Sequence, residues 1–454
     1  MSDYKSPDIF KAYDIRGLVE TEITPDFAFR VGLAFARFLE QEREPGTIVI
    51  GEDMRPSSPK LASAFSAGAT SNGMDVIRIG LASTDMLYFA SGKLNMPGAM
   101  FTASHNPAEY NGIKLCKSGA RPIGKESGLQ TIERNVAEGS PIIMRPVGVE
   151  SQRNMLDDYA THLLSLVEVS DIRPLKIVID AGNGMAGYTA RPVFNRLNVE
   201  LIELYFELDG TFPNHDANPI DPKNLEDLQR AVRKHHADIG LAFDGDADRC
   251  FLVDEKGEIV NPATLTGLIA ARELAKYPNS SVIYNLISSR SVAEIVEESG
   301  GTAIRSRVGH SYIKKLMADT GAVFGGEHSG HFYFRDFWCA DSGMLAALHA
   351  IAALGNQAKP LSKILKSYHR YFSSGEINST VADPVAILSS VEKVYEAKPG
   401  VAVDHLDGLT VSAEAWWFNL RPSNTEPLLR LNVEAKTKAR LDRVRDEVLV
   451  LLSH

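Results

Sequence analysis

The sequence predicts an α/β protein with three similar mixed-sheet modules, followed by a smaller module of α+β type. Short β-branched runs recur at residues 47–50, 176–179 and 281–284, and each leads into a loop and then a segment with helical spacing. Strands that are apolar throughout are typical of sheets covered by helices on both faces. The segment after residue 375 differs, because it reads as a strand, a helix, several strands and a closing helix.

The length and the connecting stretches predict four domains. A chain of 454 residues is too long for one compact core. Turn-rich stretches near residues 145–152 and 257–262 separate the first three modules, and the third ends near residues 368–375. We therefore expect domains over residues 1–148, 149–258, 259–370 and 371–454.

Two helices near the ends of the chain are predicted in detail. The first begins at Thr24-Pro25, because Thr is favoured as an N-cap and Pro at the first helical position. Helical spacing of apolar residues predicts its buried face, made of Phe27, Val31, Ala34 and Phe38. The closing helix is expected to bury one face formed by Leu441, Val444, Val448 and Leu451.

The composition excludes several classes of protein. The net charge is −10 and no block of Lys or Arg stands out, so nucleic acid is not an expected partner. Three widely spaced cysteines form neither a disulfide framework nor a zinc pattern, which favours a reducing compartment. The N-terminus lacks an apolar signal segment, and the longest apolar stretch, near residues 344–354, is too short to span a bilayer. We expect a cytoplasmic protein without a membrane partner.

The first candidate for chemistry is the loop Phe101-Thr-Ala-Ser-His-Asn-Pro107. Small and apolar residues at 98–101 predict a strand that delivers this loop, and its Asn-Pro pair favours a turn. A serine presented in this way can be a nucleophile or a phosphoryl carrier, and Ser104 has His105 and Lys114 nearby in the chain. The Ser-His pair alone favours an ordinary turn, so the interpretation depends on other loops.

The most specific local motif is Asp244-Gly-Asp-Ala-Asp-Arg249. Its three carboxylates at alternate positions offer oxygen ligands for Mg2+ or Ca2+, and would repel one another without a cation. An EF-hand is excluded, because its sixth position requires Gly and Arg249 stands there. Apolar runs at 239–243 and 250–253 predict buried strands on both sides, which favours a metal site over a solvated acidic turn.

Two further stretches carry candidate sugar ligands. In Gly325-Gly-Glu-His-Ser-Gly-His331, Glu327 and Ser329 could bond the neighbouring hydroxyls of a sugar. His310 could reach the same ligand. Taken alone, the first stretch is explained equally well as a Gly-rich turn, and His310 is better explained as a structural histidine.

Two more stretches carry candidate anion ligands. Arg421-Pro-Ser-Asn-Thr-Glu-Pro427 follows an apolar run at 415–420 and offers the donors of a phosphate nest. Near the N-terminus, Tyr13 and Arg16 could line an anion site. Taken alone, the first is explained equally well as a hairpin loop, and the second is better explained as a strand entering a turn.

Together and in this order, the four loops resemble those of the α-D-phosphohexomutase superfamily, most closely its bacterial phosphomannomutase/phosphoglucomutase branch. The family is marked by a phosphoserine loop, a DGDxDR metal loop, a GExSG sugar loop and an RxSxTxP-like phosphate loop, and the matches span nearly the whole chain. The resemblance implies three α/β domains that carry the first three loops. It also implies a fourth, TATA-box-binding-like α+β domain that carries the phosphate loop.

The resemblance also implies an activity. A phosphoryl group would move reversibly between the 6- and 1-positions of mannose, with glucose as a second sugar, through phosphoserine and a hexose 1,6-bisphosphate. The implied partners are one Mg2+ and the 6- and 1-phosphates of mannose and glucose, acting on a monomer or homodimer.

Individual residues receive roles from the resemblance. Ser104 would carry the phosphoryl group, Arg249 would neutralise it, and Lys114 and His105 become the candidates for general acid and base. Mg2+ would be held by an oxygen of the Ser104 phosphate together with Asp244, Asp246 and Asp248. Substrate contacts are expected from Tyr13, Arg16, Arg290, His310, Glu327, Ser329, His331, Arg421, Ser423, Asn424 and Thr425.

The chain also departs from the family pattern. Glu52 and Asp85 stand where relatives often have Arg and Pro, and Ile287 stands at the place of a ligand-facing Lys, with Arg290 as the nearest substitute. His328 matches the phosphomannomutase type, whereas phosphoglucosamine mutases usually carry Gln there. Phosphoglucosamine mutase is the nearest alternative. A metal-dependent phosphatase and a non-catalytic sugar-phosphate-binding protein are more distant ones.

Overall fold

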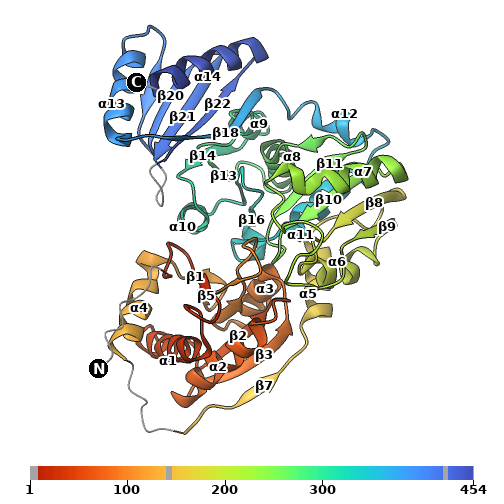
Figure 1. The fold of residues 1–454 in the computed structure, drawn as a ribbon. Coiled ribbons are helices and arrows are strands. Elements are labelled where there is room, and N and C mark those ends of the chain that lie inside the picture. The colour runs from red at the N-terminus through yellow and green to blue at the C-terminus, as the bar shows by residue number, and fades with distance from the viewer. Residues whose placement is uncertain (1–8, 140–145, 423–427, 453–454) are drawn as a thin grey trace. The chain divides into compact units, whose positions relative to one another are not determined.

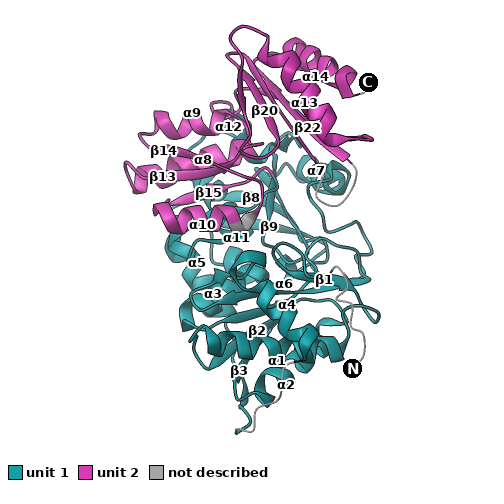
Figure 2. Cartoon of the chain, turned by 90° about the vertical axis from the view of Figure 1, so that its left-hand side faces the viewer, with its two compact units in different colours: residues 1–262, 329–364 teal, residues 263–328, 365–454 magenta. Residues whose placement is uncertain are grey.

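The computed structural model describes residues 9–139, 146–422 and 428–452, apart from the side chains of His310 and Ser311. The chain forms two compact units (Figure 2). Unit 1 contains Met1–Pro262 and Ser329–Ile364, and unit 2 contains Ala263–His328 and Leu365–His454. The expected third domain, residues 259–370, is therefore divided between the two units.

The first sheet of unit 1 has the strand order β1-β5-β4-β2-β3-β7, and β6 pairs with β5 (Figure 1). The neighbours β4, β2, β3 and β7 are parallel, whereas β1, β5 and β6 run antiparallel to their partners. Its strands are β1 (Ile15–Leu18), β2 (Thr47–Glu52), β3 (Asp75–Leu81), β4 (Gly98–Phe101), β5 (Tyr110–Lys117), β6 (Arg121–Pro122) and β7 (Glu150–Gln152). Its helices are α1 (Pro25–Gln41), α2 (Ser58–Ser71), α3 (Thr84–Leu94) and α4 (Leu129–Glu138).

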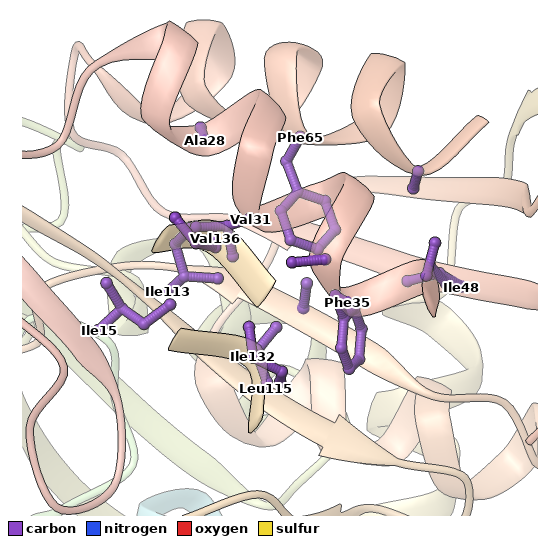
Figure 3. Packing of buried hydrophobic residues seen from close by; sticks show 14 of the residues in the cluster. Ile15, Ala28, Val31, Phe35, Ile48, Phe65, Ile113, Leu115, Ile132 and Val136 are labelled. Atoms are coloured by element: carbon purple, nitrogen blue, oxygen red, sulfur yellow. The ribbon is translucent and has the colours of Figure 1, made fainter. Parts of the chain in front are cut away.

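One face of this sheet is covered by α1, α2 and α4, whose apolar residues form a single cluster with residues of the strands (Figure 3). Ile48 and Ile50 of β2 belong to the cluster, because alternate residues of a strand share a face. The helices α1 and α2 approach each other closely at two glycines. A Cβ at Gly32 would lie 2.1 Å from the Phe65 carbonyl oxygen, and one at Gly68 would lie 2.0 Å from that of Phe29.

The second sheet of unit 1 has the order β12-β11-β10-β8-β9. Its strands are β8 (Leu175–Asp180), β9 (Val199–Leu204), β10 (Ile239–Phe243), β11 (Cys250–Asp254) and β12 (Ile259–Val260). β8 is parallel to both β9 and β10, whereas β10 and β11 form an antiparallel hairpin that ends at the pair Phe243–Cys250. The metal loop predicted at residues 244–249 is therefore the turn of this hairpin.

The helices α5 (Leu156–Leu166), α6 (Ala186–Phe194) and α7 (Glu226–His235) accompany this part of unit 1. The second chain segment of the unit contains the antiparallel pair β16 (Phe332–Phe334) and β17 (Ala340–Asp341), followed by α11 (Gly343–Gly355). All residues of α11 are buried, which explains the apolar stretch seen in the sequence. Across the described residues, no helix is both long and apolar enough to cross a membrane.

Unit 2 contains a parallel set in which β13 (Ser281–Asn285) lies between β14 (Thr302–Ser306) and β15 (Phe324–Gly326). The helices of this region are α8 (Pro262–Lys276), α9 (Ser291–Glu298) and α10 (His310–Thr320), and α12 (Leu361–Leu365) ends at the start of the unit's second segment. The last sheet is antiparallel, with the order β18-β22-β21-β20-β19. Its elements are β18 (Phe372–Thr380), α13 (Pro384–Glu396), β19 (Ala402–Asp404), β20 (Leu409–Ala413), β21 (Trp416–Pro422), β22 (Leu428–Ala435) and α14 (Lys438–Leu452).

The predicted fold class is confirmed, with three mixed or parallel sheet regions followed by an α+β segment. Thr24 caps α1 by accepting a hydrogen bond of 3.1 Å from the Phe27 N–H, as the Thr-Pro signal predicted. Two details differ. The connection expected near residues 145–152 includes β7, which pairs with β3 at the edge of the first sheet. In α14, Leu452 rather than Leu451 is the fourth buried residue of the apolar face.

Candidate active site

Ser104 lies in the loop that follows β4, at the end of the parallel part of the first sheet. Its side chain is buried and its φ of 51° is in the left-handed region, which is uncommon for a residue with a Cβ. The Ser104 N–H donates to Thr102 Oγ1 at 2.9 Å, and the Ser104 hydroxyl donates to Asp244 Oδ2 at 2.9 Å. The loop therefore presents the hydroxyl to the metal loop of the second sheet.

The Ser104 loop is held by Arg55 through hydrogen bonds to its backbone. Arg55 was not singled out from the sequence. Its guanidinium is fully buried and donates to the backbone carbonyls of four residues at 2.6–3.0 Å: Ser104, Asn106, Pro107 and Tyr110. The carboxylate of Asp53 lies 3.3 Å from Arg55 Nε and compensates its charge. The local sequence shows an Arg in the loop after β2. It does not show that the carbonyl groups to which this Arg donates lie about fifty residues further along the chain.

Arg16 contacts the same loop. It donates to Asn106 Oδ1 at 2.5 Å and to Asp14 Oδ2 at 2.5 Å. Tyr13 is half-buried and lies in the turn before β1. Of this predicted pair, the structure therefore brings Arg16 to the Ser104 loop.

The three carboxylates of the metal loop come together as predicted. Asp244, Asp246 and Asp248 are buried, and each offers an oxygen within 4.8 Å of the other two. The approach of this loop to Ser104 requires Gly245, since a Cβ there would lie 2.3 Å from the Ser104 carbonyl oxygen. Burial first, and then the charges of the two neighbouring carboxylates, raise the pKa of Asp244 well above its usual value.

Lys114 reaches the metal loop from β5. Its Nζ donates to Asp246 Oδ2 at 2.6 Å and to Asp248 Oδ2 at 2.7 Å. Burial disfavours the charged amine, but the two carboxylates outweigh it and raise the pKa of Lys114 well above its usual value. Lys114 therefore carries an ammonium group beside the carboxylates.

Arg249 connects the metal loop to two histidines. Its Nε lies 3.4 Å from Asp244 Oδ2 and 3.3 Å from His331 Nε2, and its Nη2 lies 3.0 Å from His105 Nδ1. His105 Nδ1 is also 3.2 Å from the Ser104 hydroxyl. Burial, followed by the charges of Arg249 and Arg16, lowers the pKa of His105 to about 2, so this imidazole is neutral.

The predicted sugar loop is divided between the two units. In unit 1, the Ser329 hydroxyl is 3.0 Å from His331 Nδ1, and His331 Nε2 is 3.5 Å from Asp248 Oδ1. In unit 2, Glu327 is buried at the end of β15, and Nδ1 of its neighbour His328 is 2.9 Å from Asn285 Nδ2. Ser329 and His331 thus lie with the metal loop in unit 1.

The other predicted ligands belong to unit 2. Arg290 Nη1 donates to the carbonyls of Ala413 and Glu414 at 3.0 and 3.1 Å, and Arg421 Nη2 pairs with Glu376 at 2.7 Å. His310 is the first residue of α10, and its side chain is outside the described part. Ser423, Asn424 and Thr425 lie outside the described residues.

Comparison with known proteins identifies the family. Four family profiles cover most of the chain in order: "Phosphoglucomutase/phosphomannomutase, alpha/beta/alpha domain I" over residues 7–142, domain II over 157–257, domain III over 262–371, and the C-terminal domain over 376–450. The chain belongs to the phosphoglucomutase/phosphomannomutase family. The predicted α-D-phosphohexomutase resemblance is thereby confirmed, and with it the assignment as an isomerase of the phosphohexomutase class.

Full-length relatives agree with the family assignment. A protein named phosphomannomutase from Escherichia coli K12 is 41% identical over 453 residues, with 98% of each chain covered. A protein of Xanthomonas campestris pv. campestris named phosphohexose mutases is also 41% identical, covering 96% of this chain and 97% of that protein. A crystal structure of a family protein from Burkholderia thailandensis superposes with a TM-score of 0.89 at 32% identity, covering 98% and 96% of the two chains.

Proposed function

We propose that this family member is a phosphomannomutase that interconverts mannose 6-phosphate and mannose 1-phosphate, with the glucose phosphates as second substrates. The observation that carries the proposal is the hydrogen bond of 2.9 Å from the Ser104 hydroxyl to Asp244, within a group of three buried carboxylates and beside Arg249. The names of the full-length relatives favour mannose over other hexoses.

The proposed reaction has two phosphoryl transfers. Phosphorylated Ser104 donates to the free hydroxyl of the bound hexose phosphate: the bond from phosphorus to the serine oxygen breaks, a bond to the sugar oxygen forms, and the hydroxyl proton leaves to a base. The product is a hexose 1,6-bisphosphate. After it turns over in the site, its other phosphoryl group returns to Ser104 by the reverse of the same step, which regenerates the phosphoserine.

Lys114 is the proposed acid, which protonates the departing oxygen, and His105 is the proposed base, which accepts the hydroxyl proton. Two observations support this division. Lys114 holds its proton between Asp246 and Asp248, whereas His105 is neutral and faces both the Ser104 hydroxyl and Arg249 with one ring nitrogen. Arg249 is placed to neutralise charge on the transferring group, since its guanidinium lies between Asp244 and His105.

The carboxylate loop fits a hard divalent cation. All three ligands offer oxygen, and among the described residues no donor bonds the buried Asp246 Oδ1. We assign Mg2+ to Asp244, Asp246, Asp248 and an oxygen of the Ser104 phosphate. When bound, Mg2+ would stabilise negative charge on the phosphoryl oxygens.

The remaining assignments concern the substrate. Glu327, Ser329, His310 and His331 are proposed to hold sugar hydroxyls, and Tyr13 and Arg16 to line the site. The phosphate that does not react is proposed to bind Arg421, Ser423, Asn424 and Thr425. Arg290 stays a proposed substrate contact, with its Nη1 donating to two backbone carbonyls.

The domain boundaries predicted above and the cytoplasmic location are proposed unchanged. Short interdomain segments between the family matches support the boundaries near residues 148, 258 and 370. The absence of a membrane-spanning helix among the described residues is compatible with the location. A monomer or homodimer remains our expectation.

Phosphorus NMR with Mg2+ and a trace of hexose 1,6-bisphosphate tests the proposal. Mannose 1-phosphate, glucose 1-phosphate and glucosamine 1-phosphate are offered separately, and we expect conversion of the first to its 6-phosphate, with slower conversion of the second. Conversion of the third alone would move the chain to the phosphoglucosamine mutases. Release of inorganic phosphate alone would favour a phosphatase. If none of the three sugar phosphates reacted, a binding protein would be favoured.

A further inference from the structure

Asp85 is a buried carboxylate that the proposed reaction does not use. It accepts hydrogen bonds from three hydroxyls on three different segments: Ser83, the N-cap residue of α3, Tyr159 of α5 at 2.7 Å, and Ser342, the N-cap residue of α11, at 2.6 Å. The side chain of Asp85 is 1% exposed. A carboxylate with this many donors fixes the segments that it joins, because each released hydroxyl would leave a buried polar group unsatisfied.

The N-terminus of α3 touches the metal loop directly. Thr84, between Ser83 and Asp85, donates its N–H to the Asp246 carbonyl oxygen at 3.0 Å and its hydroxyl to Asp246 Oδ2 at 2.5 Å. Thr84 therefore sets both the backbone and the carboxylate of Asp246. The conformation of Thr84 in turn depends on its two neighbours, which are bonded to each other.

The N-terminus of α11 touches the same loop at another point. Gly343, next to Ser342, lies so close that a Cβ there would be 2.6 Å from the Arg249 carbonyl oxygen and 3.0 Å from that of Ala247. The metal loop is thus contacted by Thr84 at Asp246 and by Gly343 at Ala247 and Arg249. Asp85 accepts hydrogen bonds from the two serines that precede these contacting residues in the chain, Ser83 before Thr84 and Ser342 before Gly343.

The surrounding packing holds this arrangement in place. The ring of Phe89 in α3 packs edge-on against Tyr159 and Trp338, with centroids 5.9 and 6.2 Å apart. Burial, with a smaller contribution from the charge of Asp248, raises the pKa of Asp85 to about 6 against the effect of its three hydroxyl donors. At neutral pH Asp85 is therefore an anion behind a loop that already holds three carboxylates.

We propose that Asp85 is a positioning residue for the divalent cation: by tying Ser83 to Ser342 it holds Thr84 and Gly343 against the metal loop, and so sets the carboxylate of Asp246. The inference rests on the cation site of the proposed function. Residues behind metal ligands commonly change metal affinity by about 10- to 100-fold when they are replaced. We expect a loss in the lower part of this range, because Asp85 acts through Thr84.

Calorimetric titration of Mg2+ into the full chain, freed of metal with EDTA, tests the proposal with Asp85→Asn and Ser342→Ala. Each variant is expected to bind Mg2+ about 10-fold more weakly, and to recover its mutase turnover when Mg2+ is raised in proportion. Ser342→Ala removes one of the three donors to Asp85 together with the N-cap of α11 and leaves the carboxylate in place, so it answers the question even if Asp85→Asn does not fold. Wild-type affinity in the folded variants would overturn the proposal.

Glu44→Gln is the matched control. Glu44 is another poorly exposed carboxylate, which accepts from the N–H and hydroxyl of Ser118 at 3.0 and 2.6 Å and from Arg121, none of them in the metal loop. We expect unchanged Mg2+ affinity. If Glu44→Gln lost as much Mg2+ affinity as the Asp85 and Ser342 variants, the loss would reflect a general loss of stability, and the proposal would be overturned. Wild-type protein that bound no Mg2+ would instead refute the cation site itself.

Discussion

Gly245 provides the sharpest test of how the Ser104 loop and the metal loop fit together. A Cβ at this position would lie 2.3 Å from the Ser104 carbonyl oxygen, whereas ordinary contacts of a Cβ begin near 3.4 Å. Gly245→Ala therefore requires the two loops to separate by about 1 Å. The backbone of Ser104 has little freedom to yield, because Arg55 bonds the same carbonyl oxygen at 3.0 Å.

A displacement of about 1 Å between reacting groups typically costs about 100-fold in rate. We expect Gly245→Ala to lower kcat by this factor, because Ser104 moves away from Asp244 and Arg249. Overpacking of this kind also destabilises a folded protein by about 1–3 kcal/mol. The substrate contacts of the sugar loop are not altered, so KM for mannose 1-phosphate should change little.

The assay is conversion of mannose 1-phosphate at saturating Mg2+, with thermal unfolding followed by circular dichroism on the same samples. Gly46→Ala is the matched control, because a Cβ at Gly46 would meet nothing within 4 Å. It should keep wild-type turnover. A Gly245→Ala enzyme with wild-type kcat would refute the argument that loop contact sets the geometry of transfer.

Three further predictions concern single side chains. Arg55→Lys should lower the midpoint of urea unfolding, with a loss of unfolding free energy of at least about 2 kcal/mol, because hydrogen bonds from a charged donor contribute about 1.5–3 kcal/mol each. An unchanged midpoint would contradict the role of the Arg55 guanidinium in holding the Ser104 loop. Lys114→Met should abolish turnover yet bind Mg2+ more tightly by calorimetry, since the ammonium no longer occupies Asp246 and Asp248. Lys117→Met is the matched control and should change neither, because its amine pairs with Glu42 instead. Burial lowers the pKa of His215, but the hydrogen bond and charge of Asp180 outweigh it and raise that pKa from 6.5 to about 9. The stability that this pair contributes is therefore complete below pH 6.5 and is lost as the pH rises through about 9. Wild-type unfolding free energy should fall over that interval, by less than the full pKa shift implies because solvent screens this partly exposed pair, and His215→Gln should flatten the curve. Parallel curves for the two proteins would refute the linkage.

Much of the fold could be predicted because its signals are local. The strands at the start of each module are short runs of apolar residues, and Thr24-Pro25 marks the start of α1 with its own cap. The edge strand β7 was not predicted, because Glu150–Gln152 is exposed and its sequence has no apolar alternation. It is a strand only because β3 offers it a free edge.

The sequence by itself determined the family of this protein and the candidate reactive residues, because these residues stand in contiguous loops next to buried strands. Ser104 and the three aspartates of residues 244–248 are recognisable from their order and spacing alone. Only the tertiary structure decided which residues support them. Arg55 reaches its carbonyls about fifty residues away, Lys114 pairs with aspartates more than a hundred residues further on, and Asp85 bonds Ser342, 257 residues away. Contacts of this range depend on how strands and helices pack, and packing leaves no local mark in the sequence of either partner.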